Sequence, residues 1–270
     1  MCPSRDVQEN GPVVRQSKDH VYTNLHYIPI AGFLCSCLAI LVPYCIAVYV
    51  EDVPAFLPYI SDVGGDPPQS ILFGLGFVLT STIGVAGMLL KFFIVQEQNV
   101  TNNPMVDKLN KLTLYGGIAI FFGMSLVALC PTGHLRRDGS WYWPLFVPHM
   151  VGAATVFGVG YFIAVLHLYL QILLDKSWKT SPLFKLRVVL CAIGITAMVF
   201  TSFYWPIFNT HGLDPTPFHG RKYPEGMLKS IISEWVMVVV FQIYVLTYLS
   251  DFREATFEFR VELSTHKKTI

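Results

Sequence analysis

The chain has 270 residues, of which 53% are hydrophobic and 14% are charged, and its net charge is +1 with a mean hydropathy of +0.50. Soluble proteins are about one quarter charged, so this composition points to a membrane. This composition excludes a nucleotide-binding fold and a secreted enzyme. It also excludes a nucleic-acid-binding protein, because such a protein would carry a basic patch.

Stretches without Asp, Glu, Lys or Arg recur along the chain, at 20–50, 67–90, 112–135, 139–174, 188–213 and 235–250. A hydrocarbon core of about 30 Å needs about 20 apolar residues in a helix, and the last stretch reaches that length if it begins at 231. We expect helices at 27–50, 67–95, 112–130, 144–174, 186–208 and 231–252. The sequence therefore predicts an all-α polytopic membrane protein with six transmembrane helices.

The predicted organisation has three parts: a polar N-terminal arm (1–26), a six-helix transmembrane domain (27–252) and a C-terminal tail (253–270). The first helix follows too many polar residues to be a cleaved signal peptide, so it is expected to be a retained anchor. Asp66 is expected to cap the second helix, with Pro67 as its first residue.

Both ends of the chain are expected in the cytoplasm, because six spans put them on one side and Lys and Arg are enriched on the cytoplasmic side. Fourteen of the 19 basic residues lie in the two ends and in the 91–111 and 175–187 segments. The other face holds five, namely Arg136, Arg137, Arg221, Lys222 and Lys229. The N-glycosylation sequon at Asn99 would then face the cytosol and stay unmodified.

Few polar side chains fall within the expected helices, where they are expensive and face the bundle interior or a cavity. Glu234 begins the sixth helix on the non-cytoplasmic side, where the helix dipole alone would favour a carboxylate. His149 enters the fourth helix from the same side, so the two side chains could meet. His167 lies roughly 27 Å further along that helix and is expected to snorkel or to cap at the cytoplasmic interface.

The first outer loop, at 51–69, is acidic and rich in Pro and Gly. In one interpretation, Pro58 to Asp62 form a re-entrant loop that packs on the outer ends of the fourth and sixth helices and frames a polar site with His149 and Glu234. In the other, the loop is a solvated turn. Composition alone favours the turn, because Pro, Gly and Asp are common turn residues.

Several sequence motifs resemble those of the DRAM family, the damage-regulated autophagy modulators. The most specific are Leu57-Pro58-Tyr59-Ile60-Ser61-Asp62-Val63-Gly64, Pro67-Pro68-Gln69-Ser70 and Leu72-Phe73-Gly74. Further matches are His149-Met150-Val151-Gly152-Ala153, Glu234-Trp235 and Asp251-Phe252. The resemblance covers about 57–263. It extends more distantly to a superfamily that includes a GPI-anchor lipid-remodelling factor of the Golgi and regulators of phosphoinositide kinases.

The resemblance implies a multi-pass endomembrane protein that modulates autophagy, through lysosomal function or membrane-lipid homeostasis. It supports a ligand-binding polar cluster at the outer face, made of Ser61, Asp62, His149, Glu234 and Trp235. It assigns structural roles to the remaining motif residues, Pro58, Gly64, Pro68, Ser70, Gly152 and Asp251. The expected partners are membrane lipids and other membrane proteins, with no nucleic acid.

The end of the tail makes the compartment ambiguous. Lysosomal residence follows from the family resemblance, but Lys267-Lys268-Thr269-Ile270 resembles a dilysine retrieval signal. Such a signal would keep the protein in the endoplasmic reticulum or early Golgi. A chance pair of lysines in a basic tail is the plain alternative.

The sequence contains no hydrolase, P-loop or dinucleotide-binding motif, so no catalytic residue, cofactor or metal is expected. A weak metal-binding pattern is present in His211, Asp214 and His219. His149 paired with Glu234 or Asp62 could act as a general base on a lipid ester, which would make the protein a lipid-remodelling or lipid-moving enzyme. The same pair could equally fix helix register. An ion-channel accessory subunit is a further alternative, although no span carries repeated charges.

Overall fold

The computed structural model describes residues 19–132, 143–203 and 227–260. The long helices are α1 (Tyr27–Tyr49), α3 (Gln69–Gln98), α4 (Pro104–Leu129), α5 (Trp143–Leu174), α6 (Pro182–Phe203) and α7 (Met227–Leu246). The short elements are α2 (Ile60–Val63), α8 (Leu249–Arg253), β1 (Asp19–Tyr22) and β2 (Phe257–Arg260). Six helices of the described chain are long and apolar enough to cross a membrane, the last running through α7 and α8. The predicted six-span, all-α class is confirmed.

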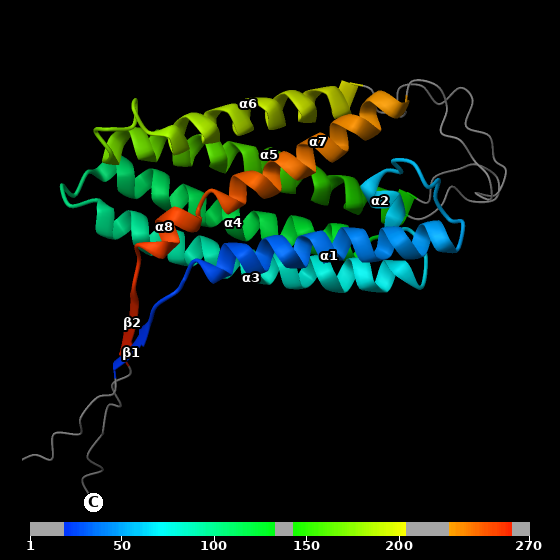
Figure 1. The fold of residues 1–270 in the computed structure, drawn as a ribbon, viewed down its shortest axis with the longest axis horizontal. Helices are drawn as coiled ribbons and strands as arrows, with labels where there is room; N and C mark the ends of the chain where they lie inside the picture. The colour runs from blue at the N-terminus through cyan, green and yellow to red at the C-terminus, as the bar shows by residue number, and fades with distance from the viewer. Residues whose placement is uncertain (1–18, 133–142, 204–226, 261–270) are drawn as a thin grey trace, which may run out of the picture.

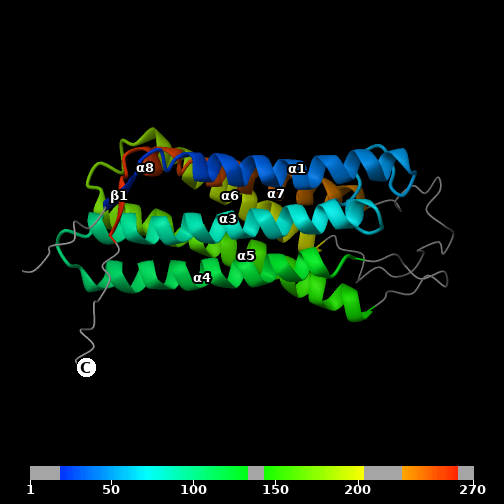
Figure 2. The ribbon, with the colours of Figure 1, turned by 90° about the horizontal axis from the view of Figure 1, so that it is seen from below.

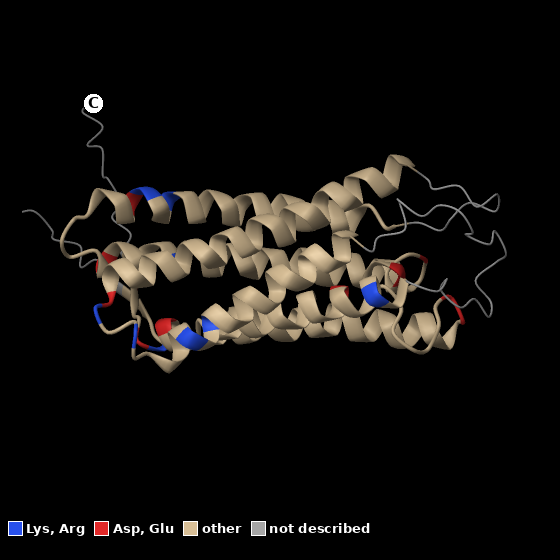
Figure 3. Ribbon diagram, turned by 90° about the horizontal axis from the view of Figure 1, so that it is seen from above, with Lys and Arg blue, Asp and Glu red and all other residues tan. Residues whose placement is uncertain are grey.

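The helices form one elongated bundle in which neighbours in sequence pack side by side (Figures 1 and 2). α1 packs on α3, α3 on α4, α4 on α5, α5 on α6 and α6 on α7, and α7 returns to contact α1. The charged residues gather toward the two ends of the bundle (Figure 3). This distribution matches a slab of hydrocarbon between two polar interfaces.

Two larger apolar clusters hold the bundle together, beside a small one made of Val95, Val106 and Leu170. One joins α5, α6 and α7 around Tyr161 and Tyr244, and the other joins α1, α3 and α4 around Phe73 and Phe77. Close helix approach contributes as well: a Cβ on Gly152 of α5 would stand 2.5 Å from the carbonyl oxygen of Gly123 on α4. Small residues at such crossings are typical of membrane bundles, where lipid removes the hydrophobic drive for association.

Two helices begin earlier than expected. α4 begins at Pro104 because the side chain of Asn103 accepts a hydrogen bond from the backbone N–H of Met105. α6 begins at Pro182, and the Ser181 hydroxyl accepts from the N–H of Phe184. Both starts combine a capping side chain with a proline in the first turn, which lacks an N–H to satisfy.

α3 begins later than expected, at Gln69, and its N-cap residue is Pro68 rather than Asp66. The prediction that Pro67 opens this helix is wrong. Pro67 is itself followed by a proline, and a residue before proline is disfavoured from helical backbone angles. The first helical turn therefore forms only after Pro68.

The sixth span was expected to be continuous, but it breaks between α7 and α8. At the break, the N–H of Tyr248 bonds to the carbonyl of Val245, three residues back, and the Thr247 hydroxyl bonds to the carbonyl of Tyr244. The carbonyl of Thr247 accepts from Arg187 of α6 at 2.8 Å. The guanidinium thus satisfies a carbonyl at the break.

The two described ends of the chain meet in an antiparallel pair of strands. β1 pairs with β2 in the register Val21 with Glu258 and Tyr22 with Phe257. This ribbon leaves the bundle at the end where α8 lies (Figure 1). Both described ends therefore lie at the same end of the bundle, and their cytoplasmic location stays a prediction.

Candidate functional site

The first loop is joined to α7 by two hydrogen bonds. The indole Nε1 of Trp235 donates to the carbonyl oxygen of Pro58 at 2.8 Å. The backbone N–H of Ile60 donates to Glu234 Oε2 at 2.9 Å. Glu234 and Trp235, which are adjacent in α7, thus bond to the residues that precede and follow Tyr59. This pair docks the loop on α7.

Three further contacts hold the same loop from other elements. The Tyr44 hydroxyl of α1 donates to the carbonyl of Ala55 at 2.7 Å. Thr132, just after α4, donates to the carbonyl of Ser61 at 3.0 Å. The two ends of the loop are joined by Gln69, whose Nε2 donates to Asp52 Oδ2 at 2.5 Å. Many of the loop's backbone groups thus find protein partners, which a loop at a membrane boundary requires.

The loop is packed rather than solvated. Tyr59 and Ile60 expose only 6% and 5% of their surface, and Val63 exposes none. A Cβ on Gly64 would overlap the ring of Phe73, so only glycine fits this contact. The loop therefore closes one end of the bundle, and the solvated-turn interpretation does not hold.

Tyr59 lies at the centre of this docked loop. Burial raises the pKa of its phenol, a hydrogen bond to Ser230 lowers it, and the nearby carboxylates of Glu234 and Asp62 raise it further. Asp62 lies in the first turn of α2 and is half-buried. Acidic side chains thus face Tyr59 both from the loop and from α7.

His149 lies at the same end of the bundle and is 3% exposed. Its Nδ1 lies 2.7 Å from the carbonyl oxygen of Cys130, at the end of α4, and the backbone of Val127 is a second hydrogen-bonding partner. The imidazole therefore ties α5 to α4. Within the described chain, His149 and Glu234 make no direct bond to each other, although both border the same cavity.

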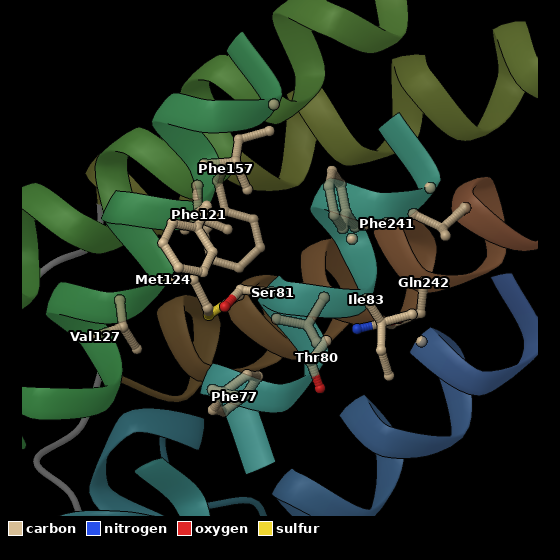
Figure 4. Close-up of a pocket in the computed structure, with 18 of the residues that line it drawn as sticks. Phe77, Thr80, Ser81, Ile83, Phe121, Met124, Val127, Phe157, Phe241 and Gln242 are labelled. Carbon is tan, nitrogen blue, oxygen red and sulfur yellow. The ribbon is translucent and has the colours of Figure 1, made fainter. Parts of the chain in front are cut away.

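That cavity runs inside the bundle between the two apolar clusters and has a volume of about 230 Å³. Figure 4 shows side chains of α3, α4, α5 and α7 converging on it. Its wall contains Phe77, Thr80, Ser81, Gly84, Phe121, Met124, Phe157, Phe241 and Gln242. Ser61, His149 and Glu234 border one end, and Lys91 with Tyr248 borders the other.

The few polar groups along the middle of the cavity are already occupied. The hydroxyls of Thr80 and Ser81 donate to the carbonyls of Gly76 and Val78 in their own helix. Gln242 donates to the hydroxyl of Ser36 across the α7 and α1 contact. The cavity wall is therefore apolar over most of its length, and polar groups remain at its ends. Such a shape suits an amphiphile with an apolar chain.

A second polar cluster lies at the opposite end of the bundle, around Asp251. Lys91 of α3 contacts Asp251 Oδ2 at 2.6 Å, and Arg187 of α6 contacts it at 3.0 Å. Arg187 also donates to the Thr247 hydroxyl and to Gln171. Lys91 and Arg187 are only 8% and 5% exposed, so both are buried cations. Asp251, expected as a structural residue, is the acid that joins three helices.

His167 belongs to this second cluster and corrects one expectation. Its side chain is only 6% exposed, and Nδ1 lies 2.6 Å from the hydroxyl of Tyr248. It therefore neither snorkels nor lies at an exposed interface. The Tyr248 ring also stacks beneath both cations, with its centre 5.5 Å from Lys91 Nζ and 5.1 Å from Arg187 Cζ.

The predicted site residues are thus divided between two ends. The loop end brings together Pro58, Ser61, Asp62, Gly64, His149, Glu234 and Trp235. Pro68 and Ser70 lie at the start of α3, Gly152 lies at the α4 crossing, and Asp251 lies at the far end. Lys267 and Lys268 fall outside the described residues, as do His211, Asp214 and His219.

Sequence reasoning missed the partners of these motif residues, namely Tyr44, Gln69, Lys91, Thr132, His167 and Arg187. One signal was available: Asp251 is an acidic residue at the edge of a span and requires a cationic partner. No group of three or more His, Cys, Asp or Glu side chains placed to hold a metal ion occurs within the ranges the structure describes.

Comparison with known proteins gives one family over most of the chain. The model for the Frag1/DRAM/Sfk1/Cwh43P N-terminal domain matches residues 24–255. DNA damage-regulated autophagy modulator protein 1 of Xenopus laevis is 29% identical over 235 residues, which cover 86% of this chain and 90% of that protein. The human protein 1 is 28% identical, over 88% of this chain and 95% of its own.

Protein 2 of the same name from mouse is also 28% identical, over 91% of this chain and 90% of its own length. No solved structure matches. The matched range includes both polar clusters, the first loop and all six spans, and the chain belongs to the Frag1/DRAM/Sfk1/Cwh43P family.

Proposed function

We propose that this membrane protein modulates autophagy and lysosomal or membrane-lipid homeostasis by binding a lipid in the cavity between its helices, without catalysis. The observation that carries the proposal is the cavity itself, which has an apolar wall and polar groups at both ends. Its relatives are named autophagy modulators, which supports a role in autophagy. The resident compartment is proposed to be endomembrane, with the lysosome as destination and the endoplasmic reticulum or Golgi as the alternative.

The hydrogen bonds at the loop end support binding over catalysis. The carboxylate of Glu234 accepts from Ile60, and the imidazole of His149 is engaged by the backbone of α4. These bonds give both side chains a structural role, whereas a general base must also lie within hydrogen-bond reach of a substrate proton. Membrane-protein partners are proposed for the surfaces outside the cavity.

A lipid-remodelling enzyme of the GPI-anchor-maturation type is the second candidate. It is favoured by one observation: His149, Ser61 and Glu234 all border the same end of the cavity. An ester bound there would lie near an imidazole and a carboxylate, the groups that acyl chemistry uses.

The experiment compares two glycine substitutions. A Cβ at Gly84 or at Gly158 would meet no atom within 4 Å, but only Gly84 borders the cavity. Gly84→Leu therefore places a bulky side chain at the border of the cavity, and Gly158→Leu is the matched control. Each protein is purified in mild detergent, and its lipids are extracted and identified by mass spectrometry.

We expect wild type and Gly158→Leu to retain a defined lipid and Gly84→Leu to lose it, with parallel loss of autophagic flux in cells. Equal, unselective lipid in all three proteins would contradict the proposal. A retained lipid that is chemically altered by wild type but not by His149→Ala would favour the enzyme instead.

A further inference from the structure

The cluster around Asp251 carries more positive than negative charge. Among the described residues, Lys91 and Arg187 share the single carboxylate of Asp251. The other named partners of the two cations, Thr247, Gln171 and the ring of Tyr248, are neutral. A buried cation is costly unless an anion compensates it. The cluster therefore has room for one further negative charge.

Lys91 is the cation that can receive that charge. Arg187 already donates to Thr247, Gln171 and Asp251. An ammonium has three N–H donors, and the hydrogen bond described for Lys91 goes to Asp251 alone. Lys91 also borders the apolar cavity, next to Tyr248 and Phe252. An anion at the end of the cavity would thus reach Lys91 directly.

The depth of Lys91 fits a lipid headgroup. Lys91 precedes the last residue of α3, Gln98, by seven positions, which is about 10 Å at 1.5 Å per residue. The 30 residues of α3 span about 45 Å, which equals the thickness of a bilayer with its headgroups. Lys91 therefore lies near the boundary between hydrocarbon and headgroups, where the phosphate of a phospholipid can be drawn inward by a lysine.

We propose that the Lys91 end of the cavity binds the phosphate of an anionic phospholipid, whose acyl chain occupies the apolar cavity toward Phe77 and Met124. The inference rests on the proposed function and adds the headgroup class and the orientation of the lipid. A zwitterionic headgroup would bring its own cation to a cluster that already has one in excess. An anionic headgroup balances the cluster, with the phosphate accepting charge-assisted hydrogen bonds from Lys91.

The test uses two lipids with the same chains, dioleoylphosphatidylglycerol and dioleoylphosphatidylcholine. Delipidated full-length protein is titrated with each lipid, and bound lipid is counted by native mass spectrometry. We expect wild type to prefer the anionic lipid by roughly tenfold, the equivalent of one charged hydrogen bond. Lys91→Gln should reduce this preference to near one, and Lys91→Arg should retain most of it.

Two outcomes separate this inference from the proposed function. If both lipids bind wild type equally and Gly84→Leu loses both, the cavity is a lipid site but the headgroup assignment is wrong. If neither lipid binds wild type, the proposed function itself fails. The wild-type preference needs no variant, so the inference can be contradicted even if Lys91→Gln does not fold.

A soluble phosphate is the other anion that could bind at Lys91. Inorganic phosphate and glycerol 3-phosphate are therefore added as competitors at matched ionic strength. We expect neither to displace phosphatidylglycerol, because neither fills the apolar cavity. Displacement by the soluble anions would overturn the lipid assignment and make the cluster a site for a free anion.

Discussion

The backbone N–H of Ile60 donates to Glu234 Oε2 at 2.9 Å, which joins two residues that are 174 positions apart in the chain. The bond connects the first loop to the last span, and Trp235 repeats the connection one residue later. The first loop, at one end of the cavity, is therefore held by α7, which comes after the other five spans in the chain. Folding of the loop and docking of α7 are coupled.

Glu234→Ala should destabilise the protein because Ile60 would lose its acceptor. We expect the free energy of unfolding to fall by about 1–2 kcal/mol, the cost of leaving a buried donor unpaired. Glu234→Gln retains an acceptor oxygen, so its loss should be smaller. Unfolding in mixed micelles measures both. Ser233→Ala is the neighbouring control, because the Ser233 hydroxyl donates within its own helix, to the carbonyl of Lys229. Equal losses for Ala and Gln at 234 would show that the bond contributes nothing.

Gly152→Ala should weaken the crossing of α4 and α5, because its Cβ would collide with the carbonyl oxygen of Gly123. Overpacking of this kind typically lowers the free energy of unfolding by about 1–3 kcal/mol. Gly158→Ala on the same helix meets no atom within 4 Å and should be neutral or stabilising by about 0.5–1 kcal/mol. The two variants are compared in the same unfolding assay. Similar stabilities for both would refute the close crossing.

Asn99 should be unglycosylated and structurally necessary. Its side chain accepts from the N–H of Asn103 at 2.9 Å and donates to Asp107 at 2.8 Å, which fixes the turn from α3 to α4. Asn99→Ala should therefore lower stability by about 1 kcal/mol, as loss of a helix cap does. Thr101→Ala destroys the sequon but leaves these bonds, and Thr101 is exposed. We expect no change in electrophoretic mobility with Thr101→Ala, and a shift to lower mass would place this turn in the lumen.

The spans were predictable because they depend on a property that every residue contributes. Hydrocarbon excludes charge, so the charge-free stretches reveal the helices without any knowledge of their partners. α4 begins eight residues before the start that hydropathy predicts, because Asn103 and Pro104 define the start by capping. The start of α6 was expected too late for the same reason, because the cap at Ser181 has no hydropathy signal. Local capping chemistry is legible in a sequence but carries no hydropathy signal.

The long-range partners could not be predicted from the sequence. Asp251 and Glu234 are visible as acidic residues at the edges of a span, but nothing local assigns Lys91 to Asp251 or Ile60 to Glu234. These pairs are 160 and 174 positions apart. Their contact depends on how six helices are arranged around the cavity. The same reason led to the wrong expectation for His167, whose side chain contacts Tyr248 at the break between α7 and α8.

The last four residues offer a test of compartment, although Lys267 and Lys268 lie outside the described residues. Replacing both lysines with serine should remove a dilysine retrieval signal, and such a signal acts only in the cytosol. With the lysosome as the proposed destination, we expect wild type and the variant to share a lysosomal distribution, as seen by fluorescence microscopy with organelle markers. Movement of the variant from the endoplasmic reticulum and early Golgi toward lysosomes would instead favour the alternative compartment. Arg253→Ser removes an exposed basic residue nearer the membrane and should leave the distribution unchanged. An identical lysosomal distribution for wild type and both variants would make the lysine pair a coincidence and leave the side of the tail to be decided by protease protection.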